Sequence, residues 1–315
     1  MRAHRIAAAV AAALTVALVV LGAAVRATDS GLSCPDWPTC YGHLVPLPGD
    51  IPAEAGYAYY QVMLEWVHRL IAGVILGPLV LLVGILALRA GREHAELRVL
   101  GILAILLLLV QAVLGGVTVL DRNSPWSVAV HLITASTLLT VLLGIALHRP
   151  AEEHGVRDRT VLGLAVATWL VGIVAFATAA VVAKTGTNLA CSDWPLCEGR
   201  LWPDMADPQV HVHMMHRIWA LFAVLMAVVF AVVARGRGHP AGRIATGAAA
   251  SGIVAMLFAG WAILAEWPAW MQVVHQAIAV FYLAHVAAAG WMTWWRWQHR
   301  LVAPAAREAR GVAGV

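Results

Sequence analysis

Charged residues are scarce in this chain of 315 residues, at 12% of the total, whereas hydrophobic residues make up 61%. A soluble globular chain carries about twice that share of charge, because polar side chains must cover its core. The low charge excludes a soluble domain, an intrinsically disordered chain and a nucleic-acid-binding domain. It indicates that membrane lipid surrounds most of the protein, and we expect no nucleic-acid partner.

The chain contains several long runs of apolar residues. A helix needs about 20 apolar residues to cross a membrane, and continuous runs exclude the alternating pattern of a barrel strand. We therefore expect an all-α polytopic membrane protein with eight membrane-spanning helices, called spans 1 to 8 in chain order. The predicted spans cover residues 6–25, 61–88, 97–119, 126–147, 160–183, 211–234, 243–264 and 270–291.

Positive charge is distributed unevenly among the connectors. Of the 21 Lys and Arg residues, fifteen lie in the termini and in or next to the connectors after spans 2, 4 and 6, four lie in the other connectors, and Arg69 and Arg217 lie within spans. Lys and Arg are enriched on the cytoplasmic side of membrane proteins. We expect a multi-pass protein of the cell membrane, with both termini cytoplasmic and the long connectors after spans 1 and 5 on the outer face.

One motif occurs twice, as Ser-Cys-Pro-Asp-Trp-Pro-Thr-Cys within residues 28–42 and as Ala-Cys-Ser-Asp-Trp-Pro-Leu-Cys within residues 185–199. Each copy follows a span and lies in a long outward connector. The repeat predicts two tandem pseudo-symmetric four-helix bundles, residues 1–150 and 151–315. It also disfavours span 1 as a cleaved signal peptide, since the equivalent span lies in mid-chain.

All four cysteines belong to these copies, as the pairs Cys34 with Cys40 and Cys191 with Cys197. Paired cysteines on an oxidising face normally form disulfides. A metal site is the alternative, although no histidine lies beside either pair at the spacing of a zinc finger. Disulfides in small exposed loops tend to be labile, so a redox role stays open.

Four histidines lie at equivalent depth in the predicted spans: His68, His131, His216 and His275. Each is five to seven residues from the outer end of its helix, or about 10 Å. Ionisable groups inside a membrane are costly and are therefore functional candidates. Two imidazoles that face each other across a four-helix bundle suit a bis-histidine haem site, and hydrogen-bonded packing is the alternative.

Other residues near these histidines are also candidates for the haem sites. Arg69 and Arg217 each follow a candidate ligand and could pair with haem propionates. Trp37 and Trp194, in the repeated motif, could cover a haem edge. Most other tryptophans are interpreted as a membrane-interface belt, notably Trp291, Trp294, Trp295 and Trp297. We interpret His211, His213 and His285 as non-ligands and expect those in connectors and termini to be solvated: His4, His43, His94, His148, His154, His239 and His299.

A single acid distinguishes the two halves. Glu65 precedes His68 by three residues and so shares its helix face, whereas His213 holds that position before His216. We interpret Glu65 as catalytic, as a proton acceptor or a stabiliser of positive charge. An ion pair with Arg69 is the alternative, and the two roles can coexist.

These residues together resemble the heme A synthase family of membrane oxidases. The resemblance is carried by Glu-x-x-His-Arg in span 2, His-Leu in span 4, His-Arg in span 6, His-Gln in span 8, and both Cys motifs. Residues 111–118 in span 3 are also similar, although span 7 has Met256 and Ile263 where a repeat would put Gln and Thr. The resemblance implies an oxidoreductase that converts the C8 methyl of heme O to a formyl group by two hydroxylations, the second giving a hydrate that loses water.

The same resemblance implies roles for the site residues. His68 and His131 would ligate the substrate heme O and Glu65 would act at the reaction, while His216 and His275 would ligate heme b. Cys34–Cys40 and Cys191–Cys197 would be disulfides of the outer face. Heme O synthase, the protoheme farnesyltransferase, would supply the substrate, a haem-copper oxidase would receive heme A, and an unidentified acceptor would take the electrons. A di-haem b-type electron-transfer cytochrome and a non-catalytic haem-binding assembly factor are the rivals, and Glu65 argues against both.

Overall fold

The computed structural model describes residues 2–148 and 158–312, and over this part of the chain it contains helices and no strand. Eight helical stretches are long and apolar enough to cross a membrane, which confirms the predicted all-α polytopic fold. The spans are α1 (Arg2–Ala27); α2 (Tyr59–Leu70), η3 (Ile71–Leu76) and α3 (Gly77–Ala90) in continuous succession; α4 (Ala95–Leu120); α5 (Pro125–Ala146); α6 (Arg159–Thr185); α7 (Pro208–Gly236); α8 (Gly242–Leu264); and α9 (Ala269–Val312). Three short 3₁₀ turns lie in the connectors: η1 (Pro48–Asp50), η2 (Ala53–Ala55) and η4 (Thr187–Leu189).

Several spans begin at side-chain caps that the sequence encodes. The Ser124 side chain accepts a hydrogen bond from a backbone amide at the start of α5, and Asp158 and Asp207 do the same for α6 and α7. Such caps satisfy N–H groups that have no partner within the helix. Pro125 and Pro208 occupy the first helical positions, where a missing N–H costs nothing.

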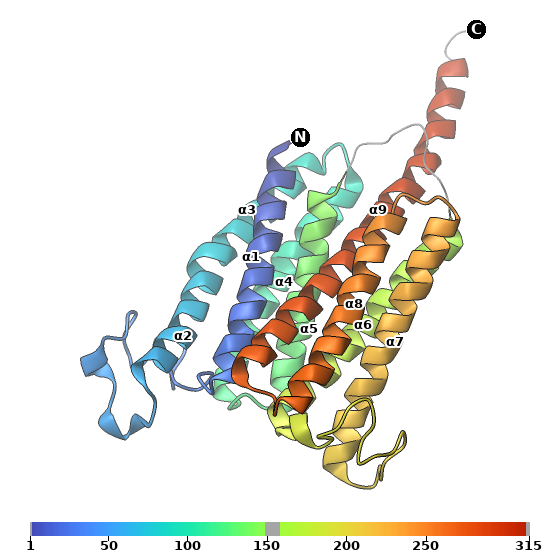
Figure 1. Ribbon diagram of the computed structural model, residues 1–315. Coiled ribbons are helices and arrows are strands. Elements are labelled where there is room, and N and C mark those ends of the chain that lie inside the picture. The colour runs from blue at the N-terminus through green and yellow to red at the C-terminus, as the bar shows by residue number, and fades with distance from the viewer. Residues whose placement is uncertain (1, 149–157, 313–315) are drawn as a thin grey trace.

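The spans pack in two groups of four. The first group packs α1 against α2, α3 and α5, with α4 between α3 and α5; the second packs α6 to α7, α7 to α8, α8 to α9 and α9 back to α6. The groups meet where α1 and α5 contact α9 and where α5 contacts α6 (Figure 1). The predicted boundary at residues 150 and 151 lies outside the described residues, and the pseudo-symmetry of two bundles stays a prediction.

Tryptophans join the two groups along α5. Trp169 donates to the Thr140 hydroxyl at 3.0 Å, Trp291 donates to the Thr140 carbonyl at 2.6 Å, and Trp295 donates to the Gly144 carbonyl at 3.2 Å. Trp291 and Trp295 stack with ring centroids 5.2 Å apart. A buried indole N–H needs an acceptor, and backbone and side-chain oxygens of α5 provide three.

The belt interpretation was therefore wrong for two of the four tryptophans named above. Trp295 is 3% exposed and Trp291 is half-buried. Gly144 makes this packing possible, since a Cβ there would lie 2.5 Å from the Trp291 ring. Trp294 is 36% exposed, as expected, and the side chain of Trp297 lies outside the described residues.

Both Cys-containing connectors lie at one end of the molecule. Figure 1 shows the start of α1 and the end of α9 at the opposite end. Span 2 differs from the other spans because η3 is a π-helical stretch that begins two residues after Arg69. Isolated π-helical turns occur frequently at functional sites, and the equivalent helix α7 is continuous.

Candidate functional site

The first Cys loop, residues 28–43, is closed by the disulfide between Cys34 and Cys40. Its turn is organised by Asp36, which accepts hydrogen bonds from the Thr39 hydroxyl and from the amides of Tyr41 (2.6 Å) and Gly42 (2.9 Å). Burial acts to raise the pKa of Asp36, but the Thr39 hydroxyl and the two amides outweigh it and hold that pKa below its ordinary value of 3.8. The loop is thus a preorganised unit.

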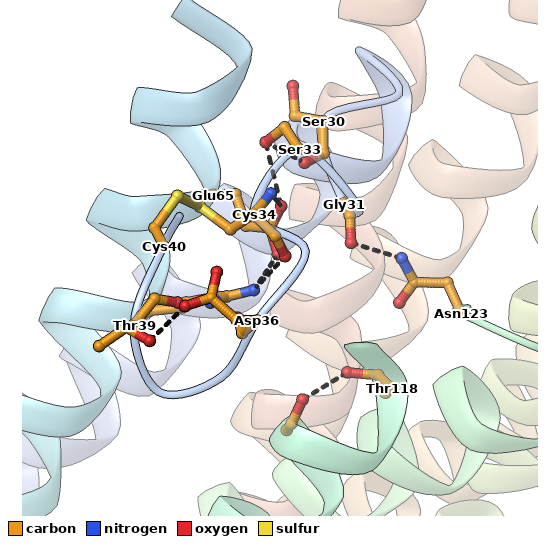
Figure 2. Close-up of polar contacts among 12 residues, drawn as sticks. Ser30, Gly31, Ser33, Cys34, Asp36, Thr39, Cys40, Glu65, Thr118 and Asn123 are labelled. Carbon is orange, nitrogen blue, oxygen red and sulfur yellow. Dashed lines mark hydrogen bonds and ion pairs between the residues drawn. A yellow bond between two sulfur atoms is a disulfide. The ribbon is translucent and has the colours of Figure 1, made fainter. Parts of the chain in front are cut away.

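The loop rests on Glu65, which is only 4% exposed. Figure 2 shows the carboxylate directed at the disulfide end of the loop. Its Oε2 atom accepts from the Ser33 hydroxyl at 3.0 Å and from the Cys34 amide at 2.9 Å, and its Oε1 atom accepts from Arg69 at 2.6 Å. The ion pair predicted from the i, i+4 spacing is present.

The Arg69 side chain holds the same loop by donating hydrogen bonds to backbone carbonyls of that loop. Its Nη1 atom donates to the carbonyls of Asp36 at 2.6 Å and Thr39 at 2.7 Å, and Nη2 donates to the Cys34 carbonyl at 3.0 Å. On the far side, Asn123 donates to the Gly31 carbonyl at 2.6 Å (Figure 2). Arg69 therefore has a loop-holding role that the sequence did not reveal, and its pairing with a haem propionate stays a prediction.

The second Cys loop, residues 185–200, repeats this arrangement. Cys191 and Cys197 form a disulfide, and Asp193 accepts from the amides of Glu198 at 2.9 Å and Gly199 at 2.8 Å. These amide bonds, the Gly199 bond first, hold the pKa of Asp193 below its ordinary value of 3.8. Each loop also has one antiparallel bridge, as residues Cys40 with His43 and Cys197 with Arg200.

Arg217 holds the second loop as Arg69 holds the first. It donates to the carbonyls of Leu196 at 2.8 Å, Cys191 at 2.9 Å and Asp193 at 2.9 Å. The guanidinium fork suits several acceptors at once. A propionate contact for Arg217 likewise stays a prediction.

His213 occupies in the second half the place that Glu65 has in the first. It is 3% exposed, its Nδ1 atom lies 3.3 Å from the Cys191 amide, and its Nε2 atom lies 3.0 Å from Nε of Arg217. His213 therefore supports the loop, and its position three residues before His216, which matches that of Glu65 before His68, was the sequence signal for this role. A neutral imidazole accepts at one nitrogen only, so His213 cannot accept both bonds at once, whereas the Glu65 carboxylate accepts all three of its own.

His68 and His131 lie together below the first loop, half-buried and close enough for their charges to interact. Within the described chain, no hydrogen-bond partner reaches the buried Nδ1 atom of either ring. Gln111 contacts His131, with the two Nε2 atoms 3.2 Å apart. Gly22 faces His68, and a Cβ there would lie 3.2 Å from the ring. The His68 ring packs directly on Gly22, and buried imidazole nitrogens without partners in the described chain fit the ligation of a haem iron.

His216 and His275 form the corresponding pair below the second loop and are also close enough for their charges to interact. The Thr178 hydroxyl lies 3.3 Å from Nδ1 of His216, which orients the ring and leaves Nε2 for a ligand. Nδ1 of His275 is buried without a partner among the described residues. These residues also fit a haem with two axial imidazoles. Ligation of iron by any of the four histidines stays a prediction.

A tryptophan of each loop packs over a glycine of the neighbouring span. A Cβ at Gly116 of α4 would lie 3.3 Å from the Trp37 ring, and one at Gly260 of α8 would lie 2.6 Å from the Trp194 ring. Because each lies under a loop tryptophan, Gly116 and Gly260 occupy equivalent positions in the two halves. Counting back five residues from each makes Gln111 equivalent to Ala255. The comparison of span 3 with Met256 and Ile263 was thus one residue out of register.

The expectation that connector and terminal histidines are solvated was wrong for three of them. His4, His148 and His239 are 5%, 2% and 5% exposed. The half-exposed His43 side chain agrees with the expectation, while His154 and the side chain of His299 lie outside the described residues.

The fold and the site together define a helical membrane protein with two half-buried histidine pairs, each beneath a disulfide-closed loop. The chain belongs to the cytochrome oxidase assembly protein family, whose sequence model matches residues 5–287. This match, with the relatives described next, confirms the resemblance to heme A synthases.

Proteins named heme A synthase are similar over most of the chain. The one from Shouchella clausii is 32% identical over 221 residues, which cover 68% of this chain and 70% of that protein. The one from Exiguobacterium sp. is 29% identical over 227 residues, covering 69% of each. The one from Caulobacter vibrioides is 30% identical over 328 residues, covering 90% of this chain and 93% of that protein.

Proposed function

We propose that this protein is a heme A synthase, which oxidises the C8 methyl group of heme O to a formyl group. The observation that carries the proposal is the position of Glu65. It is a buried carboxylate one helical turn from His68, in a chain whose relatives bear that name. The second half has no acid at the equivalent position, so the acid is not required to build the scaffold.

The reaction removes four electrons from the methyl carbon. Written with water as the oxygen donor, each hydroxylation breaks one C–H bond, forms one C–O bond and releases two electrons and two protons, and the geminal diol formed by the second loses water to leave the aldehyde. An oxidant outside the chain takes the electrons. The protein is thus an oxidoreductase that acts on a CH₃ group.

In this proposal His68 and His131 would hold heme O by its iron, with Glu65 as the group that acts on the C8 methyl. Glu65 accepts a proton released at the carbon or stabilises positive charge that develops there, a role worth about 10²–10⁴ in rate for a positioned group. Arg69 and the Cys34 amide keep the carboxylate in place. Preorganised groups of this kind need no rearrangement at the moment of reaction.

In the second half, His216 and His275 would hold heme b. When bound, heme b supplies one-electron transfer. Thr178 orients His216, and His213 takes the loop-supporting place without adding a carboxylate. Trp37 and Trp194 cover the outer edges of the two haem sites.

The proposed orientation in the membrane follows from the distribution of Lys and Arg, and the proposed supplier and recipient of haem follow from the reaction. Both termini lie in the cytoplasm and both Cys loops on the outer face of the cell membrane, in a chain built as two pseudo-symmetric bundles. Heme O synthase supplies the substrate, and a haem-copper oxidase receives the product.

Pigment extraction tests the proposal. The chain is expressed with a heme O synthase in a host that makes no heme A, and extracted haems are separated by chromatography. We expect heme A in addition to heme B and heme O. Purified protein that binds haem but yields only heme B and heme O would favour a di-haem cytochrome or an assembly factor.

Substitution of the second pair tests the heme b assignment. His216→Ala or His275→Ala should remove heme B from the haems extracted from the purified protein and abolish the share of the bis-imidazole spectrum that heme b contributes. An unchanged spectrum in both variants would contradict it.

A further inference from the structure

A second cluster of histidines lies at the end of the molecule opposite the Cys loops. It consists of His94 at the start of α4, Glu96 in the first turn of α4, and His148 just beyond α5. One ligand atom from each of the three lies within 4.8 Å of the others. Nε2 of His148 is 3.2 Å from Oε1 of Glu96, and Nδ1 of His94 is 3.8 Å from the same oxygen.

Two further side chains enclose this cluster. His4 of α1 is 5% exposed, its ring centroid lies 6.3 Å from that of His148, and its Nε2 atom is buried with no hydrogen-bond partner among the described residues. The ring of Trp295 of α9 contacts the ring of His148 edge to face, with the ring centroids 4.9 Å apart. A buried ring nitrogen without a partner is costly, and it is available to a ligand.

We propose that His94, Glu96 and His148 bind a divalent transition-metal ion of the zinc class, with His4 as the fourth ligand. Imidazole nitrogens select zinc, copper or nickel rather than magnesium or calcium, which prefer oxygen ligands. Zinc–nitrogen bonds of about 2.0 Å place tetrahedral ligand atoms about 3.3 Å apart. Side-chain rotation closes the widest separation among the three, 4.8 Å at most, by about 1.5 Å, and the His4 ring, whose centroid is 6.3 Å from that of His148, moves towards them to complete the site.

Four protein ligands leave no open position, which is typical of structural rather than catalytic zinc. The ion would fasten α1, α4 and α5 together under Trp295, and Glu96 would offset the positive charge that nearby Arg5 contributes. His148 lies seventeen residues along the chain from His131, or about 26 Å of helix. The site is thus separate from the proposed haem chemistry and independent of it.

Metal binding to the purified, haem-containing protein tests this site. Protein in detergent is stripped with a chelator and titrated with Zn²⁺ alone, and bound zinc per chain and the midpoint of thermal unfolding are measured. We expect one tightly bound zinc in the wild type and a zinc-dependent rise in the midpoint. His94→Ala and Glu96→Gln should each weaken this binding at least tenfold and remove the rise.

His43→Ala is the matched control, because His43 also pairs with an acid, Asp50 at 3.6 Å, but lies in an exposed loop. It should bind zinc as the wild type does. The haem spectrum reports that each variant is folded, and Glu96→Gln keeps the side-chain shape if His94→Ala does not fold. Equal zinc affinity in all four proteins, or no tight site in the wild type, would overturn the proposal and leave the function at Glu65 untouched.

Discussion

The two Cys loops share a scaffold and differ in one supporting side chain. Both have a buried disulfide, an aspartate-capped turn, an arginine that donates to three loop carbonyls, and a tryptophan over a glycine. Beneath them, Glu65 supports the first loop and His213 the second. The shared parts are sufficient to explain the loops, so the carboxylate is the feature that needs a chemical explanation.

Two other differences between the two halves lie close to the first histidine pair. Gln111 contacts His131, whereas the equivalent position beside the second pair is Ala255. Span 2 contains η3 directly after Glu65, His68 and Arg69, whereas α7 is regular. Departures from the repeat thus concentrate around the first histidine pair, where the reaction is proposed.

The largest expected effect comes from exchanging the two supporting residues. Glu65→Gln and Glu65→His should each lower heme A formation at least about 100-fold, because a general acid–base group contributes that much or more. His213→Gln should leave formation within a few-fold of the wild type. Chromatography of extracted haems measures all three.

Glu65→His is the decisive variant, because it installs the residue that supports the second loop. If it forms heme A at the wild-type rate, Glu65 only holds the loop, and the proposed chemistry at this carboxylate is wrong.

The second-largest effect is expected on stability, when either of the loop-holding arginines, Arg69 or Arg217, is replaced. Arg69→Met should cost about 3–5 kcal/mol of unfolding free energy, because it leaves Glu65 buried without its ionic partner. Arg217→Met should cost only about 1–3 kcal/mol, since it leaves neutral groups unsatisfied. Unfolding midpoints in detergent compare the two, and equal losses would mean that the Glu65–Arg69 pair adds nothing.

The disulfides should behave alike. Each closes a loop with a sequence separation of 6, so replacing either pair by serine should cost about 2 kcal/mol in the chain-entropy account. The four cysteines are 0–1% exposed, and shielded sulfurs favour a structural role. We expect heme A per folded protein to be unchanged in both double variants, and a loss confined to the Cys34–Cys40 variant would instead assign that pair a redox role.

The smallest effect is the pH dependence of the loops. The pKa values of Asp36 and Asp193 are lowered in the folded protein, so each carboxylate adds stability above 3.8 that is lost as the pH falls through its lower folded value. Asp36→Asn and Asp193→Asn should each cost less than about 1 kcal/mol, because solvent screens these half-exposed groups. Unfolding midpoints of variant and wild type should converge as the pH falls below 3.8 through the lowered folded pKa values, and a constant difference would contradict this account.

Much of the fold followed from composition and periodicity. All eight spans lie where the apolar runs predicted them, because in lipid the length of an apolar run decides where a helix lies. The ion pair of Glu65 with Arg69 also followed, since local i, i+4 spacing determines it.

The remaining features depend on contacts between distant segments. Nothing in the sequence near Arg69 shows that its donors face the carbonyls of residues some thirty positions earlier. His4 and His148 were misjudged as solvated for the same reason, because they are buried by their packing against each other and Trp295. Tertiary packing, rather than sequence position, decided these environments.

The tryptophan contacts on α5 make the two halves mechanically inseparable. Thr140, which accepts from both Trp169 and Trp291, lies nine residues from His131 on the same rigid helix, or about 14 Å. A shift of the second half is therefore transmitted along α5 towards His131. Separating the two groups of helices would leave the three indole N–H donors of Trp169, Trp291 and Trp295 without these acceptors on α5.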